Sequence, residues 1–328
     1  MPPEIARESI RSGARAGLID YLRIARFDHA TKHVFIIPGI VFAYILRGPQ
    51  GRDIWLSVVE GLVAAICIAA ANYVINEWLD RDFDRHHPTK SGRTAVQLEL
   101  DGRLVLVEWA AFIAIGLAAA WLSSRTMFFA AAIFGLQGVI YNVPPLRSKD
   151  KPYLDVISES INNPLRLTIG WAMVDPSTIP PGSIVIAYWL GGAFLMAAKR
   201  LSEYREIVAA YGKAQLCLYR KSFEGYSEIS LTGSCFVYAM GSSFFLSVFL
   251  IKYRIEYLLL MPVIIALFAV YLALSMQPGS TAQRPERLFR ERELMILAAL
   301  LCVMFVFTTL IDIPALNSLT VQQFIKVQ

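Results

Sequence analysis

Residues 76–93 read NEWLDRDFDRHHPTKSGR, a run of acidic and basic side chains that begins where a long apolar segment, residues 54–79, comes to an end. Within this run Asn76, Asp80 and Asp84 are spaced four residues apart, so on a helix they lie within about 80° of one another along one face. Two carboxylates and a carboxamide on one stripe are the oxygen ligands from which Mg²⁺ sites for phosphorylated substrates are built. The alternative is a solvated helix end of mixed charge, but ionisable groups that continue an apolar segment at membrane depth favour a functional site.

The composition around this stretch is that of an integral membrane protein. The chain has 328 residues, of which 56% are hydrophobic and 17% charged, and its mean hydropathy is +0.50. Most of its apolar segments are long enough to cross a hydrocarbon core of about 30 Å. We predict an all-α protein with nine transmembrane helices, consisting of a cytoplasmic amphipathic segment (residues 1–32) and one transmembrane catalytic domain (residues 33–328). The predicted spans are 33–47, 54–79, 103–123, 126–141, 153–174, 183–198, 229–251, 255–276 and 293–313.

The distribution of basic residues supports this topology and predicts its orientation. Most of the 31 Lys and Arg residues fall in the N-terminal segment and in the connections after the second, fourth, sixth and eighth spans. By the positive-inside rule these regions are cytoplasmic, which places the protein in the inner (plasma) membrane with its N-terminus inside. Membrane orientation and anionic substrates account for the net charge of +5, so nucleic acid is not needed as a partner. The four cysteines show no paired spacing and indicate neither disulfides nor zinc.

The connection before the fifth span and the span itself also carry polar groups. Residues 141–151 contain two prolines and three cations, including Arg147. In the fifth span Asp155, Glu159 and Asn163 are spaced at i, i+4 and i+8, which predicts that they line an aqueous cavity or pair with one another. A purely structural network that holds the helices together is the alternative.

The third cationic connection, residues 198–228, leaves the sixth span with Lys199, Arg200 and Glu203 on adjoining turns. Three basic connections on one side of the membrane, one of them bearing the acidic stripe, predict a site for a phosphorylated substrate together with its cation.

These residues resemble the motifs of a known family. Residues 76–84 resemble the N-D-x-x-D-x-x-x-D signature of the UbiA superfamily of intramembrane prenyltransferases, with Glu77 in place of the second-position Asp, and the nine-span count agrees. Within that superfamily the chain is most similar to the decaprenyl-phosphate phosphoribosyltransferase branch. The similarity to that branch lies in Arg26 and Lys32 before the first span, His87-Pro88-x-Lys90-x-x-Arg93, Tyr141 to Arg147, Leu165-Arg166, and residues 198–203.

The resemblance implies transfer of 5-phosphoribosyl from phosphoribosyl pyrophosphate to a polyprenyl (decaprenyl) phosphate, with release of pyrophosphate, as a Mg²⁺-dependent step of cell-wall biosynthesis. It implies that Asn76, Asp80 and Asp84 hold the metal, and that Asp80, Asp84 and Lys199 are catalytic. The substrate-binding residues that it implies are Lys32, His87, Lys90, Arg93, Tyr141, Arg147, Arg166, Arg200 and Glu203. Prenyltransferases of the ordinary branch carry a second acidic motif in the third connection, whereas this chain has Lys199 and Arg200 beside a single Glu203.

Two other interpretations stay open. The first is an enzyme of the same fold that transfers a prenyl group from a prenyl diphosphate to an aromatic or other acceptor. The second is a transporter, which is disfavoured because the charges gather on one side instead of near the midplane and no inverted repeat of broken helices is visible. The lipid bilayer is an implied partner in every case, and the sequence is compatible with a homo-oligomer.

Overall fold

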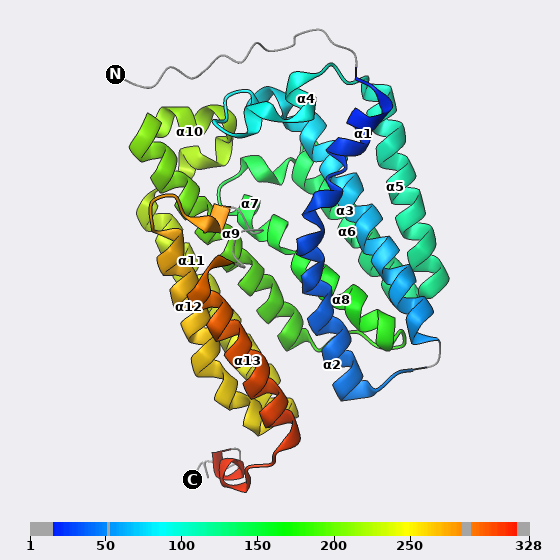
Figure 1. Cartoon of the computed structure of the whole chain (residues 1–328), viewed down its shortest axis with the longest axis vertical. Helices are drawn as coiled ribbons and strands as arrows, with labels where there is room; N and C mark the ends of the chain where they lie inside the picture. The colour runs from blue at the N-terminus through cyan, green and yellow to red at the C-terminus, as the bar shows by residue number, and fades with distance from the viewer. Residues whose placement is uncertain (1–15, 51–52, 284–289, 320–328) are drawn as a thin grey trace, which may run out of the picture. The chain divides into compact units, whose positions relative to one another are not determined.

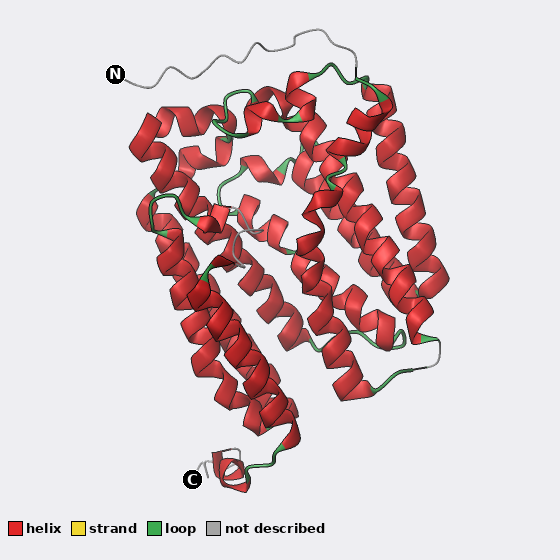
Figure 2. Cartoon of the chain, viewed as in Figure 1, coloured by secondary structure: helices red, strands yellow, loops and turns green. Residues whose placement is uncertain are grey.

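The computed structural model describes residues 16–50, 53–283 and 290–319, and every regular element in these ranges is a helix (Figures 1 and 2). The all-α prediction is therefore confirmed for the described part of the chain. Residues 1–15 of the predicted amphipathic segment lie outside it.

The α-helices are α1 (Leu18–Ile24), α2 (Ile37–Arg47), α3 (Ile54–Asp84), α4 (Thr94–Gln97), α5 (Gly102–Ser123), α6 (Arg125–Asn142), α7 (Leu154–Ser160), α8 (Asn162–Val174), α9 (Gly182–Tyr211), α10 (Lys213–Tyr219), α11 (Glu228–Tyr253), α12 (Met261–Ser275) and α13 (Arg292–Leu310). Short 3₁₀ helices, among them η1 (Phe27–Ile36), η2 (Lys90–Gly92), η3 (Ser148–Asp150) and η4 (Lys221–Gly225), connect them.

Six helices of the described residues are long and apolar enough to cross a membrane: α3, α5, α9, α11, residues 255–275 and α13. They correspond to six of the nine predicted spans. The predicted span 33–47 contains α2, which has only 11 residues, and the predicted span 126–141 corresponds to α6, which carries the polar Gln137 and Asn142. The predicted span 153–174 is divided into α7 and α8 at Ile161. The nine-span count thus stays a prediction for these three segments.

The chain divides into two compact units. The first comprises Met1–Pro180 and Ala210–Gly225, and the second comprises Pro181–Ala209 and Tyr226–Gln328. The segment 210–225 therefore belongs to the first unit, although the helices on either side of it in the sequence belong to the second.

Helix α3 is the central element of the first unit, where it packs against α5, α6 and α8 (Figure 1). The side of α3 that faces them is made of small residues, including Ala64, Ala65 and Ala69, with Ile68 filling the space between. In a lipid environment small residues favour helix association because they let two backbones approach closely. The alanine-rich middle of α3 thus fixes where its polar C-terminal end lies.

Glycines mark two further close approaches within this unit. A Cβ added at Gly138 of α6 would overlap the side-chain carboxamide of Asn72 on α3, so a larger residue fits there only if Asn72 or the helix moves. In the same way, Cβ atoms at Gly39 and Gly170 would overlap the backbone of Leu167 and Ile36, where α2 and η1 pack against α8. The Gly138 contact lies one turn before Asn142, the last residue of α6, and so brings the ends of α3 and α6 together.

The second unit is built from α9 and the helices α11 to α13. Ser242 of α11 donates a hydrogen bond to the carbonyl oxygen of Ala187 in α9 (2.8 Å), and Phe194 of α9 packs edge-on against Phe268 of α12. Near the end of α13, Arg254 donates a hydrogen bond to the carbonyl oxygen of Thr308 (2.5 Å). Helix α9 carries Lys199, Arg200 and Glu203 in its second half.

Candidate active site

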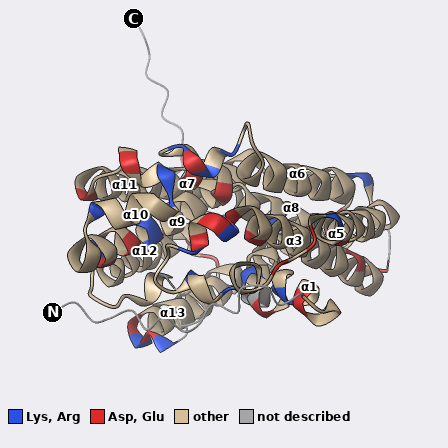
Figure 3. Cartoon of the chain, turned by 90° about the horizontal axis from the view of Figure 1, so that it is seen from above, with Lys and Arg blue, Asp and Glu red and all other residues tan. Residues whose placement is uncertain are grey.

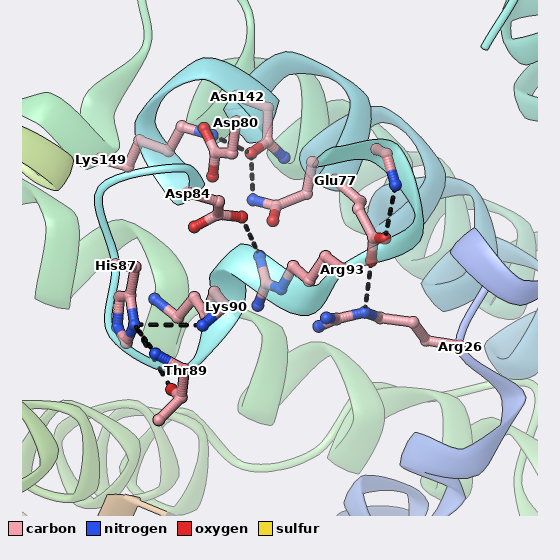
Figure 4. Close-up of polar contacts among 12 residues, drawn as sticks. Arg26, Glu77, Asp80, Asp84, His87, Thr89, Lys90, Arg93, Asn142 and Lys149 are labelled. Carbon is pink, nitrogen blue, oxygen red and sulfur yellow. Dashed lines mark hydrogen bonds and ion pairs between the residues drawn. The ribbon is translucent and has the colours of Figure 1, made fainter. Parts of the chain in front are cut away.

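The predicted acidic stripe lies on the last three turns of α3, at an end of the first unit where charged residues gather near α3, α7 and α10 (Figure 3). Both carboxylates of the stripe have cationic partners from elsewhere in the unit. Asp80 accepts from Arg147 (2.8 Å). It also accepts from the ammonium of Lys149 (2.5 Å), while Asp84 forms an ion pair with Arg93 (Figure 4). The predicted residues Asp80, Asp84, Arg93 and Arg147 therefore meet in one cluster.

Arg147 and Lys149 reach Asp80 from the turn that follows α6. The Arg147 guanidinium also donates to Asp150 (3.0 Å) and to the carbonyl oxygen of Asn142 (3.1 Å), so it is held on three sides. Arg147 adopts φ = +25° and Arg26 adopts φ = +54°, a region that residues other than glycine rarely occupy. Both arginines pair with acidic residues of the 76–84 stretch, which places backbone strain at this cluster.

Lys149 is the most deeply buried cation of the cluster, with 4% of its surface exposed. Burial lowers the pKa of Lys149 to about 8, although the neighbouring Asp80 carboxylate acts in the opposite direction. At neutral pH the side chain therefore remains an ammonium group. It donates to Asp80 and also to the side-chain oxygen of Asn142 (2.8 Å).

The connection after α3 folds back over the acidic stripe. The ring nitrogen Nδ1 of His87 accepts hydrogen bonds from the backbone N–H groups of Thr89 (3.1 Å) and Lys90 (3.3 Å), which forms a compact turn at Pro88 (Figure 4). The turn leads through η2 to Arg93 at the start of α4. Burial, followed by the nearby Arg26 charge, lowers the pKa of Arg93 below its usual range.

Glu77, the residue that departs from the UbiA signature, holds two other segments at this end of α3. Its carboxylate accepts from Nε of Arg26 (2.8 Å) and from the backbone N–H of Ala95 (3.4 Å), and only 3% of the residue is exposed (Figure 4). Glu77 thereby ties the region before η1 and the start of α4 to α3. It is a structural anchor of the connection that carries Arg93.

The segment 210–225 lies against the same connection. Gln215 donates to the carbonyl oxygen of His86 (2.7 Å), and the ring of Tyr219 packs against that of His87, with centroids 4.4 Å apart. The ammonium of Lys90 lies 5.8 Å from the centroid of the Tyr219 ring.

Asp155 fixes the other end of this segment. It is fully buried, accepts a hydrogen bond from Ser222 (3.2 Å) and forms an ion pair with Arg220 (3.6 Å). The sequence predicted that Asp155 would line a cavity or pair with polar residues of its own span, whereas these partners come from η4 and the residue before it.

The other predicted residues of the first unit lie close to the stripe or in its core. Lys32 lies over the ring of Tyr73 (5.2 Å to the centroid), one turn before Asn76 on α3. Tyr141 is buried and its ring faces the Lys149 ammonium at 5.8 Å. Arg166 is buried on α8, where its guanidinium lies over the Phe134 ring at 4.8 Å and donates to the carbonyl oxygen of Asn162 at 3.4 Å.

Lys199, Arg200 and Glu203 lie on α9 in the second unit. Arg200 and Glu203 are both buried, and they form an ion pair of 3.2 Å with each other. Glu203 therefore compensates the charge of Arg200.

The donor set on α3 fits a magnesium ion. Among the residues that the structure describes, no group of three or more His, Cys, Asp or Glu side chains could hold a metal by itself. Magnesium needs no such group, because one or two carboxylates suffice when substrate phosphates and water supply the other oxygens. Asp80 and Asp84, with the carboxamide of Asn76, supply this minimal set, and the surrounding cations suit a diphosphate.

Sequence reasoning identified the acidic stripe but missed several of its partners. Lys149 was noted only as one of three cations in its connection, and Asn142, Glu77 and Arg220 were assigned no role. The available signal was their position: Asn142 ends α6 just before Pro144, and Lys149 follows Arg147 by two residues.

Comparison with known proteins shows the family to which this chain is similar. Residues 35–291, more than half of the chain, match the UbiA prenyltransferase family. The chain is 32% identical over 173 residues to a protoheme IX farnesyltransferase of Geobacillus thermodenitrificans (strain NG80-2), which covers 51% of this chain and 55% of that protein. It is 30% identical over 118 residues to a lycopene elongase/hydratase of Haloarcula japonica, which covers 36% of this chain and 39% of that protein. The chain thus spans about half or less of the length of these curated relatives.

Solved structures share the fold. A UbiA homologue from Archaeoglobus fulgidus bound to GPP and Mg²⁺ superposes with a TM-score of 0.66 at 23% identity, covering 89% of this chain and 100% of that one. A digeranylgeranylglyceryl phosphate synthase superposes with a TM-score of 0.61 at 16% identity, covering 89% of this chain and 98% of that one. The motif residues, the helical fold and the match over residues 35–291 agree, and the chain belongs to the UbiA prenyltransferase family of multi-pass membrane proteins.

Proposed function

We propose that this protein is a Mg²⁺-dependent transferase that moves an isoprenoid chain from a prenyl diphosphate to an acceptor within the membrane. The observation that carries the proposal is the cluster at the end of α3. Two carboxylates and a carboxamide, suited to one Mg²⁺, are surrounded there by Arg93, Arg147 and Lys149, which suit the oxygens of a diphosphate.

In this proposal Asn76, Asp80 and Asp84 would hold Mg²⁺, which would supply Lewis-acid stabilisation of the diphosphate leaving group. The bond between C1 of the donor and the diphosphate oxygen breaks, and the diphosphate keeps the electron pair. A nucleophilic atom of the acceptor bonds to C1 and releases its proton. Arg93, Arg147 and Lys149 balance the negative charge that builds up on the leaving diphosphate, and their fixed positions require little reorganisation during the step.

Two findings favour an isoprenoid as the transferred group. The Geobacillus relative is a farnesyltransferase by name, and the Archaeoglobus homologue was solved with GPP and Mg²⁺.

Phosphoribosyl transfer to a polyprenyl phosphate is the second candidate, and the connection after α3 favours it. The His87-Pro88-x-Lys90-x-x-Arg93 pattern, which resembles the phosphoribosyltransferase branch, forms an ordered turn that ends in the Arg93–Asp84 ion pair. Phosphoribosyl pyrophosphate carries a 5-phosphate besides its pyrophosphate, and a lipid phosphate as acceptor adds a further anion. Lys90 and the cations of the cluster suit such a pair of substrates.

A transfer assay separates the two candidates. Protein reconstituted in nanodiscs is incubated with Mg²⁺ and either radiolabelled prenyl diphosphates of several chain lengths with a membrane lipid extract, or ribose-labelled phosphoribosyl pyrophosphate with polyprenyl phosphate. We expect label in a new organic-soluble product, together with released pyrophosphate, only with a prenyl diphosphate and only with Mg²⁺. Label from ribose in an organic-soluble lipid would instead establish the second candidate, and activity unchanged by EDTA would contradict both.

A further inference from the structure

We propose that Asn142, at the end of α6, is a positioning residue that turns the carboxamide of Asn76 so that its oxygen faces the metal. The inference rests on the proposed function, in which Asn76 is a metal ligand. It concerns a residue to which the 76–84 signature assigns no role, because Asn142 belongs to a different helix.

The orientation of the Asn142 carboxamide follows from its partners. Its nitrogen Nδ2 donates to the backbone carbonyl oxygen of Gly138 (2.8 Å), and its oxygen Oδ1 accepts from the ammonium of Lys149 (2.8 Å). A carbonyl oxygen can only accept and an ammonium group can only donate, so these two contacts admit a single orientation of the amide. Asn142 therefore presents its oxygen, and not its nitrogen, toward α3.

This orientation dictates that of Asn76. The Asn142 oxygen also accepts a hydrogen bond from Nδ2 of Asn76 (2.5 Å). If the Asn76 amide were rotated by 180°, two carboxamide oxygens would face each other, which loses the hydrogen bond and adds repulsion. The NH₂ group of Asn76 is thus committed to Asn142, and its oxygen is the atom left for a cation. Only the oxygen of a carboxamide is a ligand for Mg²⁺.

Burial keeps the hydrogen bonds among Asn76, Asn142 and Lys149 in place. Asn142 is 2% exposed and Lys149 is 4% exposed, so water does not compete freely for their hydrogen bonds. The Asn142 and Lys149 side chains lie next to Asp80 (Figure 4), to which Lys149 also donates (2.5 Å). The close approach of α3 and α6 at Gly138 brings Asn142 within reach of Asn76. Partners that orient a metal ligand typically contribute about tenfold to a hundredfold to metal affinity.

The test measures Mn²⁺ binding by electron paramagnetic resonance of the detergent-solubilised full chain in the presence of geranyl diphosphate without an acceptor. Mn²⁺ accepts the same oxygen ligands as Mg²⁺, and the diphosphate supplies the oxygens that the protein does not. The variants are Asn142→Leu, Asn142→Asp, Asn76→Ala and the double variant Asn76→Ala/Asn142→Leu. Gln137→Leu is the matched control, because Gln137 is another buried carboxamide of α6 and donates instead to the carbonyl oxygen of Ser158 (2.5 Å).

We expect Asn142→Leu to weaken Mn²⁺ binding by about tenfold or more, and Gln137→Leu to leave it within about twofold of the original protein. Asn142→Asp keeps an oxygen acceptor for Asn76 and Lys149 but loses the bond to Gly138. Asn142→Asp should therefore retain Mn²⁺ binding even though it lowers the melting temperature. If Asn142 had only a structural role, this variant would lower the Mn²⁺ affinity and the melting temperature together. In the Asn76→Ala background, Asn142→Leu should have no further effect on binding, because Asn142 acts through Asn76.

Three outcomes would overturn the inference. Unchanged Mn²⁺ affinity in Asn142→Leu, with weakened affinity in Asn76→Ala, would remove the role of Asn142 and leave the proposed function intact. Additive effects in the double variant would show that Asn142 does not act through Asn76. Absence of Mn²⁺ binding in the original protein would remove the metal role of α3 and the inference with it. If Asn142→Leu does not fold, Asn142→Ala takes its place in the same comparison.

Discussion

Asp80, Asp82 and Asp84 lie within little more than one turn at the end of α3 but in different surroundings. Asp80 and Asp84 are largely covered and pair with Lys149, Arg147 and Arg93, whereas the side chain of Asp82 is 66% exposed and lies 3.6 Å from that of Arg85. An exposed pair of this kind contributes little to stability, while the two covered carboxylates sit where charge is concentrated. The difference in environment separates the proposed metal ligands from a solvated acidic residue two positions away.

At this scale we predict that Asp80→Asn and Asp84→Asn each lower kcat/KM by at least about a hundredfold, because a lost ligand removes charge stabilisation of several kcal/mol in the transition state. Asp82→Asn is the matched control and should leave kcat/KM within about twofold. Pyrophosphate release under saturating Mg²⁺ measures all three, with circular dichroism to verify that the helices are retained. Full activity in Asp80→Asn or Asp84→Asn, or equal losses in all three variants, would contradict the assignment.

The sequence could predict the acidic stripe but not its partners. The spacing of Asn76, Asp80 and Asp84 is a local property, which helix geometry converts directly into a shared face. Which cation meets which carboxylate depends on how the turn after α6 folds, and Arg147 takes a positive φ there that no local pattern indicates. Asn142 was missed for the same reason, since its role follows from contacts with a different helix.

Among the elements, α3 and α6 show how a single glycine sets the geometry of the site. Gly138 allows the two helices to approach, and Asn72 of α3 donates across the contact to the carbonyl oxygen of Phe134 (3.1 Å). The same approach brings Asn142 to Asn76. Helix packing and the proposed orientation of the Asn76 carboxamide are therefore linked through one interface.

We predict that Gly138→Ala pushes α6 away from α3, lowers the melting temperature by several degrees and reduces kcat/KM by about tenfold or more, because overpacking of a close contact costs about 1–3 kcal/mol. Gly233→Ala on α11 is the control, since a Cβ there meets nothing within 4 Å, and alanine is a better helix former than glycine. Differential scanning fluorimetry in detergent, followed by the transfer assay, measures both effects. An unchanged melting temperature and activity in Gly138→Ala would show that the contact is not tight.

Most helices could be predicted from hydropathy, and the deviations have local causes. The predicted span 153–174 is interrupted at Ile161, just before Asn162, Asn163 and Pro164. Pro164 lacks the N–H that would bond to the carbonyl of Ser160 in a continuous helix, and it disfavours a helical conformation in the residue before it. The high mean hydropathy over this long segment concealed the break, although Pro164 in the sequence indicated it.

At the scale of the whole molecule, the first unit contains the complete acidic cluster, and the segment 210–225 joins it from a distant part of the sequence. Gln215, Tyr219 and Ser222 anchor this segment to the connection after α3 and to Asp155. Hydropathy could not predict this, because the division into two units depends on contacts that are distant in the sequence.

The charge asymmetry of the sequence predicts that the connections 80–102, 142–152, 199–228 and 277–292 are all cytoplasmic and that the C-terminus is outside. Residues 284–289 and 320–328 lie outside the described residues. Single cysteines placed at Lys90 and Lys199, after replacement of the four native cysteines, should both react with a membrane-impermeant maleimide only in inside-out vesicles. Labelling of the two positions from opposite sides of the membrane would refute the predicted topology.

The most direct test of the central claim, that the end of α3 binds a diphosphate through Mg²⁺, is the dissociation constant of geranyl diphosphate measured without an acceptor, in Mg²⁺ and in EDTA. We predict that Mg²⁺ tightens binding to the original protein by about tenfold or more, equivalent to about 1.4 kcal/mol. In Asp80→Asn the Mg²⁺-dependent gain should disappear while the weak binding in EDTA remains, because Arg93 and Arg147 are still present. Equal affinity in Mg²⁺ and EDTA for the original protein, or a gain that survives in Asp80→Asn, would contradict the account.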